Sequence, residues 1–127
     1  MFSINGSVKF RYIPNYKDMR GGYYKLSGVV RELNEGVMEE GTAYVFTSRN
    51  QKLVKIIRHE HNECQYYQQR FDGNVSFIRL RFKDCHPEYI LEWKYVVALL
   101  CCPAVKSLDA EQVLNNHNVQ YDTKLCV

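Results

Sequence analysis

The sequence has no apolar run long enough to cross a membrane. Its longest uncharged, strongly apolar stretch covers residues 95–105, whereas a membrane-spanning helix needs about 18 or more such residues. Residues 1–10 also lack the basic flank and apolar run of a secretory signal. We therefore expect a soluble protein of the reducing cytoplasm, without a membrane partner.

Paired cysteines and a strong charge imbalance are also missing. The five cysteines form no CxxC pair, and an odd number cannot all pair within one chain, so free thiols are expected. The formal net charge is only +3, too small by itself to indicate a nucleic-acid partner. The 127 residues fit one domain over residues 1–127, with a core at about 2–105 and a C-terminal helix and tail at 106–127.

Sequence signatures of common enzymes are absent too. The chain contains no GxSxG, GxxxxGK[ST] or HExxH motif, so acyl transfer, nucleotide hydrolysis and zinc proteolysis lack their usual carriers. His59, His61 and Cys64 carry the side chains that zinc prefers, but their spacing matches no metal-binding motif. The sequence therefore predicts no enzyme, no cofactor and no metal ion.

Apolar residues in a repeat of two predict strands, and steps of three and four predict helices. We expect strands at residues 8–12, 42–47, 53–57, 64–71 and 75–83. Residues 17–33 predict a helix with a buried stripe formed by Met19, Tyr23, Leu26, Val30 and Leu33. The glycines of that segment indicate either a close approach of another backbone or an irregular first turn.

A second helix is expected over residues 87–100, before Pro103. Its predicted apolar stripe consists of Ile90, Trp93, Val97 and Leu100. A last helix is expected to begin near Ser107 or Asp109. The predicted fold is α+β: an antiparallel sheet of about five strands, with an N-terminal helix inserted after strand one and C-terminal helices packed on the sheet.

Basic residues supply the main candidate binding surface. Arg79, Arg81 and Lys83 alternate with apolar residues and would share one face of the strand expected at 75–83. Together with cations near residues 49–55, they would form a positive face that contacts phosphates. A solvated face is the alternative, because charges on exposed strands also prevent edge aggregation.

Two stretches resemble a known family. Residues 18–30, DMRGGYYKLSGVV, resemble the start of the IS66 Orf2-like family, the TnpB accessory proteins of bacterial insertion sequences, which carry a DMRKGF-like start and a DGLAGLV-like helix. Residues 41–56 resemble the strand, basic turn and LKIL-like strand of that family. The family's turn is usually an arginine-rich run, whereas Asn50 and Gln51 here leave only Arg49 and Lys52.

The resemblance continues at residues 64–77, which are similar to the family's aromatic strand, glycine turn and following strand, and it covers about residues 2–105. It implies a non-enzymatic accessory protein of DNA transposition that acts beside a separate, larger transposase. The implied partners are element-end DNA, the transposase, or both, and homo-oligomers remain open. The candidate DNA- or partner-binding residues are Arg20, Arg49, Lys52, Lys55, Arg79, Arg81 and Lys83.

Two other hypotheses remain at this point. One is a small metal-dependent enzyme that uses His59, His61 and Cys64, and the other is a purely structural interaction domain. Salt-dependent DNA binding would favour the accessory protein. Stoichiometric zinc, with loss of activity on chelation, would favour the enzyme.

Overall fold

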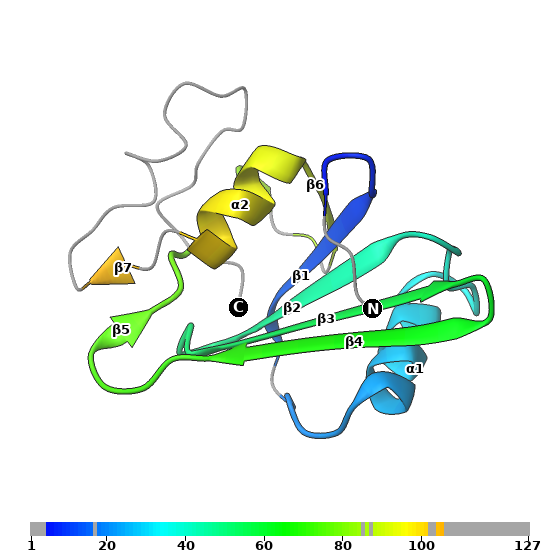
Figure 1. The fold of residues 1–127 in the computed structure, drawn as a ribbon, viewed down its shortest axis with the longest axis horizontal. Helices are drawn as coiled ribbons and strands as arrows, with labels where there is room; N and C mark the ends of the chain where they lie inside the picture. Colours follow the sequence, from blue (N-terminus) through cyan, green and yellow to red (C-terminus); the bar gives the residue numbers. More distant parts are fainter. Residues whose placement is uncertain (1–4, 17, 85, 87, 102–103, 106–127) are drawn as a thin grey trace.

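A computed structural model describes residues 5–16, 18–84, 86, 88–101 and 104–105. Five strands form the main sheet and two helices flank it (Figure 1). In chain order the elements are β1 (Phe10–Tyr16), α1 (Tyr23–Leu33), β2 (Ala43–Ser48), β3 (Leu53–Glu60), β4 (Glu63–Arg70), β5 (Val75–Ser76), β6 (Tyr89–Leu91), α2 (Trp93–Cys101) and β7 (Ala104–Val105). The last helix expected from the sequence lies outside the described residues.

The main sheet is mixed rather than antiparallel. Its strand order is β4-β3-β2-β1-β6, and β1 runs parallel to β2 while every other neighbour is antiparallel. The parallel pair follows from the connection, because the chain crosses from β1 to β2 through α1 and re-enters the sheet at the same end. The α+β class is thus confirmed, and the expectation of a wholly antiparallel sheet is wrong at this one pair.

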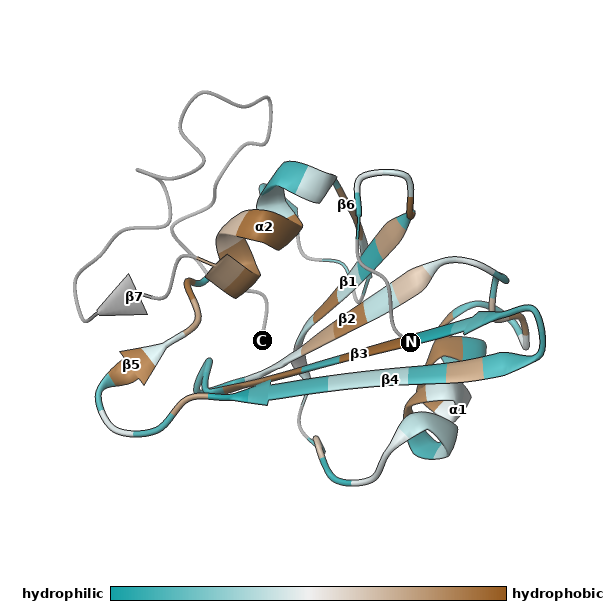
Figure 2. Ribbon diagram, viewed as in Figure 1, coloured by the Kyte–Doolittle hydropathy of each residue, from teal (hydrophilic) through white to brown (hydrophobic). Residues whose placement is uncertain are grey.

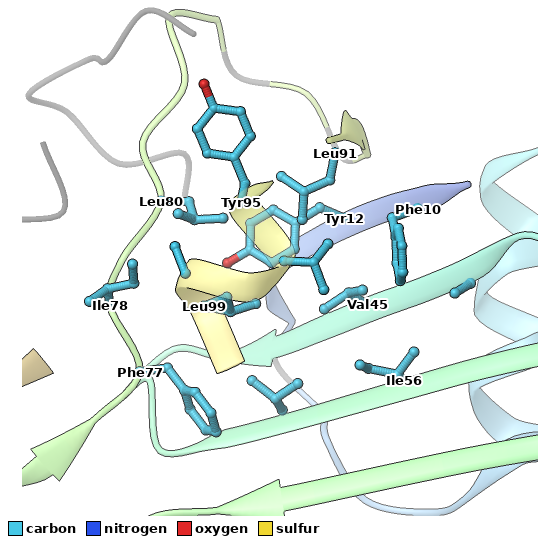
Figure 3. Close-up of a cluster of buried hydrophobic side chains, with 14 residues drawn as sticks. Phe10, Tyr12, Val45, Ile56, Phe77, Ile78, Leu80, Leu91, Tyr95 and Leu99 are labelled. Atoms are coloured by element: carbon cyan, nitrogen blue, oxygen red, sulfur yellow. The ribbon is translucent and has the colours of Figure 1, made fainter. Parts of the chain in front are cut away.

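Both faces of the sheet are covered. One hydrophobic cluster joins Phe10, Val45 and Ile56 to α2, and a second joins Phe46 and Ile57 to α1. Figure 1 shows the two helices on opposite sides of the strands, and Figure 3 shows the α2-side cluster. The central strands β2 and β3 therefore have almost no solvent-exposed face, which explains their continuous runs of apolar residues.

Helix α1 begins later than the sequence pattern indicates. It starts at Tyr23, because Gly21 adopts a positive φ of 84° and the segment before it is irregular. Leu26 and Val30 are fully buried, but Leu33 at the C-terminal end is 37% exposed, so its predicted burial is wrong. The irregular first turn accounts for Gly21, whereas no close backbone packing requires Gly28: a Cβ there would meet no other atom within 4 Å.

Residues 75–83 do not form the expected long strand. Only Val75–Ser76 is a strand, and it pairs with β7 in a separate small sheet. Phe77, Ile78 and Leu80 are nevertheless buried against the α2-side cluster. The apolar residues of this segment alternate because an extended chain buries every second side chain, even where it is not a strand. A repeat of two therefore indicates which side chains are buried, but not whether the backbone forms hydrogen bonds with a neighbouring strand.

The second expected helix is also shifted. Residues 89–91 form the edge strand β6, paired with β1, and the helix begins only at Trp93. Ile90 is 75% exposed and Val97 is 36% exposed, so the predicted stripe is wrong at these two residues, whereas Trp93 and Leu100 are partly buried against the α2-side cluster. The buried residues of α2 are Tyr95, Val96, Ala98 and Leu99. Neither helix in the described part of the chain is long and apolar enough to span a membrane.

Replacing Leu26 by alanine tests the α1-side cluster. Because Leu26 is 0% exposed, the substitution is expected to lower the free energy of unfolding by about 2–5 kcal/mol through lost burial and a residual cavity. Urea-induced unfolding monitored by circular dichroism measures this change. Tyr24→Ala, on the same helix but 80% exposed, serves as the control and should change stability much less; equal effects would contradict the assignment.

Alkaline unfolding tests the buried hydroxyl of Tyr12. Tyr12 and Thr47 share a buried hydrogen bond of 3.0 Å, and burial raises the pKa of Tyr12 to about 12. The unfolded chain loses this proton near pH 10 and the folded chain only near pH 12, so stability should fall by roughly 2–3 kcal/mol across that range. Tyr12→Phe should remove this part of the pH dependence, whereas Tyr24→Phe should preserve it.

Candidate functional site

The loop at residues 18–22 is held by a buried lysine. Lys55 lies on β3 and is 5% exposed. Its Nζ donates to the carbonyl oxygen of Met19 and, at 2.7 Å, to that of Gly21. Burial lowers the pKa of Lys55, and repulsion from nearby Lys25 and Arg70 acts in the same direction. Lys55 therefore holds the loop in place through these hydrogen bonds and is not an exposed cation.

Asp18 also fixes the loop at residues 18–22. Its carboxylate accepts hydrogen bonds from Arg20 Nε at 2.9 Å and from Lys25 Nζ. These hydrogen bonds, of which the one from Arg20 has the largest effect, hold the pKa of Asp18 well below its usual range. Gly21 has a positive φ, and a Cβ there would lie 2.8 Å from Lys25 Cδ. A glycine suits this turn on both grounds.

An open pocket of about 550 Å³ lies between this loop and the sheet. Three cations but only one carboxylate line it; the lining residues are Asp18, Met19, Arg20, Leu53, Lys55, Gln68 and Arg70. Because Asp18 already pairs with Arg20 and Lys25, the positive charge of Lys55 and Arg70 is not cancelled within the pocket. The chemistry of the lining suits an anion with several acceptor oxygens.

The β2–β3 turn carries further cations and is fixed in place. Gln51 is buried with a positive φ of 59°. Its Nε2 donates to the carbonyl of Ile78 at 2.9 Å, and its own carbonyl accepts from the backbone amide of Phe77 at 2.7 Å. Arg79 Nη2 donates to the carbonyl of Arg49 at 2.6 Å. The turn and the segment after β5 thus form one unit.

These contacts gather positive charge at one end of the sheet. We call this group the basic end; it consists of Arg49, Lys52, Arg70 and Arg79. Arg70 belongs to it because it pairs with Leu53, the first residue after the turn. Within the described chain, no carboxylate lies within 4.0 Å of Arg49, Lys52 or Arg70. Burial lowers the pKa of Arg79, and repulsion from nearby Arg81 acts in the same direction.

The other end of the sheet is acidic. We call this group the acidic end; it consists of Glu39, Glu40, Glu60 and Glu63, around the β3–β4 turn and the start of β2. Three of them have basic partners: Glu39 pairs with Lys9 at 3.8 Å, Glu60 pairs with Arg58, and Glu40 lies 3.3 Å from the Nδ1 of His59. The sheet therefore carries opposite charge at its two ends.

The structure separates the other predicted binding residues. Arg20 is exposed on the loop beside the pocket, Arg81 is half-buried near Arg79, and Lys83 is exposed. Because residues 77–84 are not a strand, Arg79, Arg81 and Lys83 form no regular row. Arg70 and Gln68 were missed by the sequence analysis; pairing β3 with β4 across the two-residue turn at 61–62 would have placed them beside Leu53 and Lys55.

The histidine-rich segment does not form a metal centre in the described residues. His59 and Cys64 are cross-strand neighbours, whereas His61 occupies the turn and pairs with Glu60 at 3.5 Å. No group of three or more His, Cys, Asp or Glu side chains in the described part of the chain is placed to hold a metal ion. The geometry gives the metal-enzyme hypothesis no support.

Lys55→Met tests the role of the buried lysine. The variant leaves the buried carbonyl of Met19 and the part-buried carbonyl of Gly21 without their donor, so the free energy of unfolding should fall by about 1–3 kcal/mol. Amide hydrogen exchange at residues 18–22 should accelerate at the same time. Lys52→Met, which removes a donor to the exposed carbonyl of Gly73, is the matched control. Unchanged amide hydrogen exchange at residues 18–22 in Lys55→Met would contradict this role of Lys55.

Comparison with known proteins agrees with the sequence resemblance. The family model described as IS66 Orf2 like protein matches residues 9–108, a span that includes the loop, the pocket and the basic end. Neither a curated protein nor a solved structure matches the chain. The family match alone covers most of the sequence, and on that basis the chain belongs to the IS66 Orf2-like family of insertion-sequence accessory proteins.

Proposed function

We propose that this chain is a non-enzymatic, cytoplasmic accessory protein of transposition that binds the DNA backbone through its basic end. The observation that carries the proposal is the charge separation along the sheet. Arg49, Lys52 and Arg70 have no carboxylate within 4.0 Å in the described residues, whereas the opposite end pairs most of its charges internally. Cations that are not neutralised by a carboxylate are available to phosphates.

The pocket beside the basic end also supports binding to the DNA backbone. Arg20 lines it from the loop but already bonds Asp18, whereas Arg70 lines it from β4 without a carboxylate partner in the described residues. The guanidinium of Arg70 can donate two parallel hydrogen bonds to one phosphate. Phosphate contacts fix the position and orientation of a protein on a duplex but carry no base information. We therefore expect binding that depends strongly on salt and little on sequence.

Contact with the transposase is the second candidate function. Ile90 lies on the three-residue edge strand β6 and is 75% exposed. An exposed large apolar residue on a sheet edge suits a protein partner better than a phosphate backbone. The two functions are compatible, because β6 and the basic end lie on different parts of the sheet.

The salt dependence of duplex binding tests the DNA proposal. Each neutralised phosphate contributes roughly −0.9 to the slope of log K against log salt, so Arg49→Ala combined with Arg70→Ala should flatten the slope by about two. Fluorescence anisotropy with a labelled duplex across a salt series measures this. The matched control is Lys9→Ala with Arg31→Ala, which removes two exposed cations outside the basic end and should leave the slope nearly unchanged.

Equal slopes in both double variants, or no binding by the unaltered chain, would refute the role of the basic end. A pull-down with the transposase encoded beside this chain, with and without element-end DNA, then separates the two candidates. Capture that needs no DNA and survives Arg49→Ala with Arg70→Ala but not Ile90→Asp would assign the function to the protein contact.

A further inference from the structure

Strand β4 is the long edge of the main sheet. It spans eight residues, Glu63–Arg70, and within the described chain β3 is its only neighbour in the sheet. From the geometry and charge of this edge we propose that a second copy of the chain pairs with β4 in antiparallel orientation, joining the two sheets into one. This inference does not depend on DNA binding.

The direction of the backbone amides in β4 is set by the hairpin. The two-residue turn makes Glu60 and Glu63 a hydrogen-bonded pair, and such pairs alternate along an antiparallel ladder. The amide of Phe71 accordingly donates to the carbonyl of Lys52, at 2.9 Å. Odd-numbered residues therefore bond to β3, and the even-numbered ones direct their amides and carbonyls to the open edge: Cys64, Tyr66, Gln68 and Arg70.

This edge lacks the features that usually prevent pairing. Proteins protect edge strands with proline, inward-pointing charges, bulges or very short strands. β4 has no proline, its register with β3 is continuous over all eight residues, and its only charges are Glu63 and Arg70 at the two ends. Figure 2 shows β4 as largely hydrophilic, whereas the neighbouring β3 is mostly hydrophobic except towards the β3–β4 turn. By contrast, β6 at the other edge is three residues long.

Charge identifies a second copy as the partner. An antiparallel pair related by a two-fold axis places the acidic end of one copy beside the basic end of the other, at both ends of the joint. In the described residues, Glu63 has no cation within 4.0 Å, and Arg70 has no carboxylate within 4.0 Å. A parallel pairing would instead place like charges together, so complementarity favours the antiparallel joint.

Symmetry limits the register. A two-fold axis perpendicular to the sheet keeps each residue on its own face, and the outward amides require even-numbered residues to pair with even-numbered ones. Of the registers that this rule allows, two keep nearly the whole length of β4 paired: one pairs Cys64 with Gln68 of the second copy, and the other pairs Cys64 with Arg70. In both, Tyr66, which is 38% exposed, becomes covered by the second copy. Main-chain hydrogen bonds would provide most of the affinity.

Proline substitution at an outward amide provides the first test. Gln68→Pro removes an N–H that faces the open edge and none that faces β3, whereas Gln68→Ala keeps the backbone donor. Sedimentation equilibrium without DNA should show self-association for the unaltered chain and for Gln68→Ala, and a monomer for Gln68→Pro. Circular dichroism and cooperative thermal unfolding establish that the proline variant is folded. A monomeric unaltered chain at all concentrations would overturn the proposal.

Cysteine crosslinking provides a second test that does not need a disruptive variant. Residues in a hydrogen-bonded antiparallel pair have Cα atoms about 5.5 Å apart, which a disulfide can span. Under mild oxidation, Gln68→Cys or Arg70→Cys should form an intermolecular bridge to Cys64, located by peptide mass mapping. Gln69→Cys, on the opposite face, is the control and should not. A bridge in either register supports the joint; bridges in neither, or equal bridging by Gln69→Cys, would refute it.

Discussion

The fold depends on burial of the two central strands from both sides. Phe46 and Ile57 face α1, whereas Val45 and Ile56 face α2. A sheet with only one covered face would leave one of these sets in water, at a cost of roughly 1.5–3 kcal/mol for each large side chain. Both helices and the irregular segment at 77–80 are therefore needed to complete the two clusters. The parallel β1–β2 pair follows from placing α1 between these strands.

The sequence predicts β2, β3 and β4 well, because their patterns and turn residues agree. Their expected ranges differ from the observed strands by three residues at most. The prediction was wrong at 77–83 and 88–92 for different reasons. At 77–83, packing against α2 imposes burial at spaced positions, and a sequence pattern records burial without recording backbone pairing. At 88–92, the helical spacing does not correspond to burial. Ile90 fits a helical stripe in sequence, but it is exposed on β6.

The binding surface was predicted less completely than the core. A lysine on a strand has the same sequence pattern whether its ammonium group faces water or a carbonyl group. Lys55 was therefore grouped with Arg49, although in the structure it bonds to the loop at 18–22. Arg70 was missed because its importance depends on its partner across the hairpin, Leu53, and not on its own neighbours in the chain. Strand register was the information that the pattern lacked.

Arg70 belongs both to the proposed DNA-binding surface and to the proposed pairing edge, so the two kinds of binding would affect each other. Its side chain lines the pocket beside the loop, while its backbone amide faces the open edge of β4. A second copy paired there would cover the edge next to the pocket and place its acidic end beside the basic end, which would reduce the positive potential there. Phosphate binding by Arg70 and self-association would then oppose each other, and thermodynamic linkage requires that each weaken the other by the same factor. Arg49, in the β2–β3 turn and not on the edge of β4, would remain available to phosphates in both states, so pairing would reduce the number of phosphate contacts without abolishing binding.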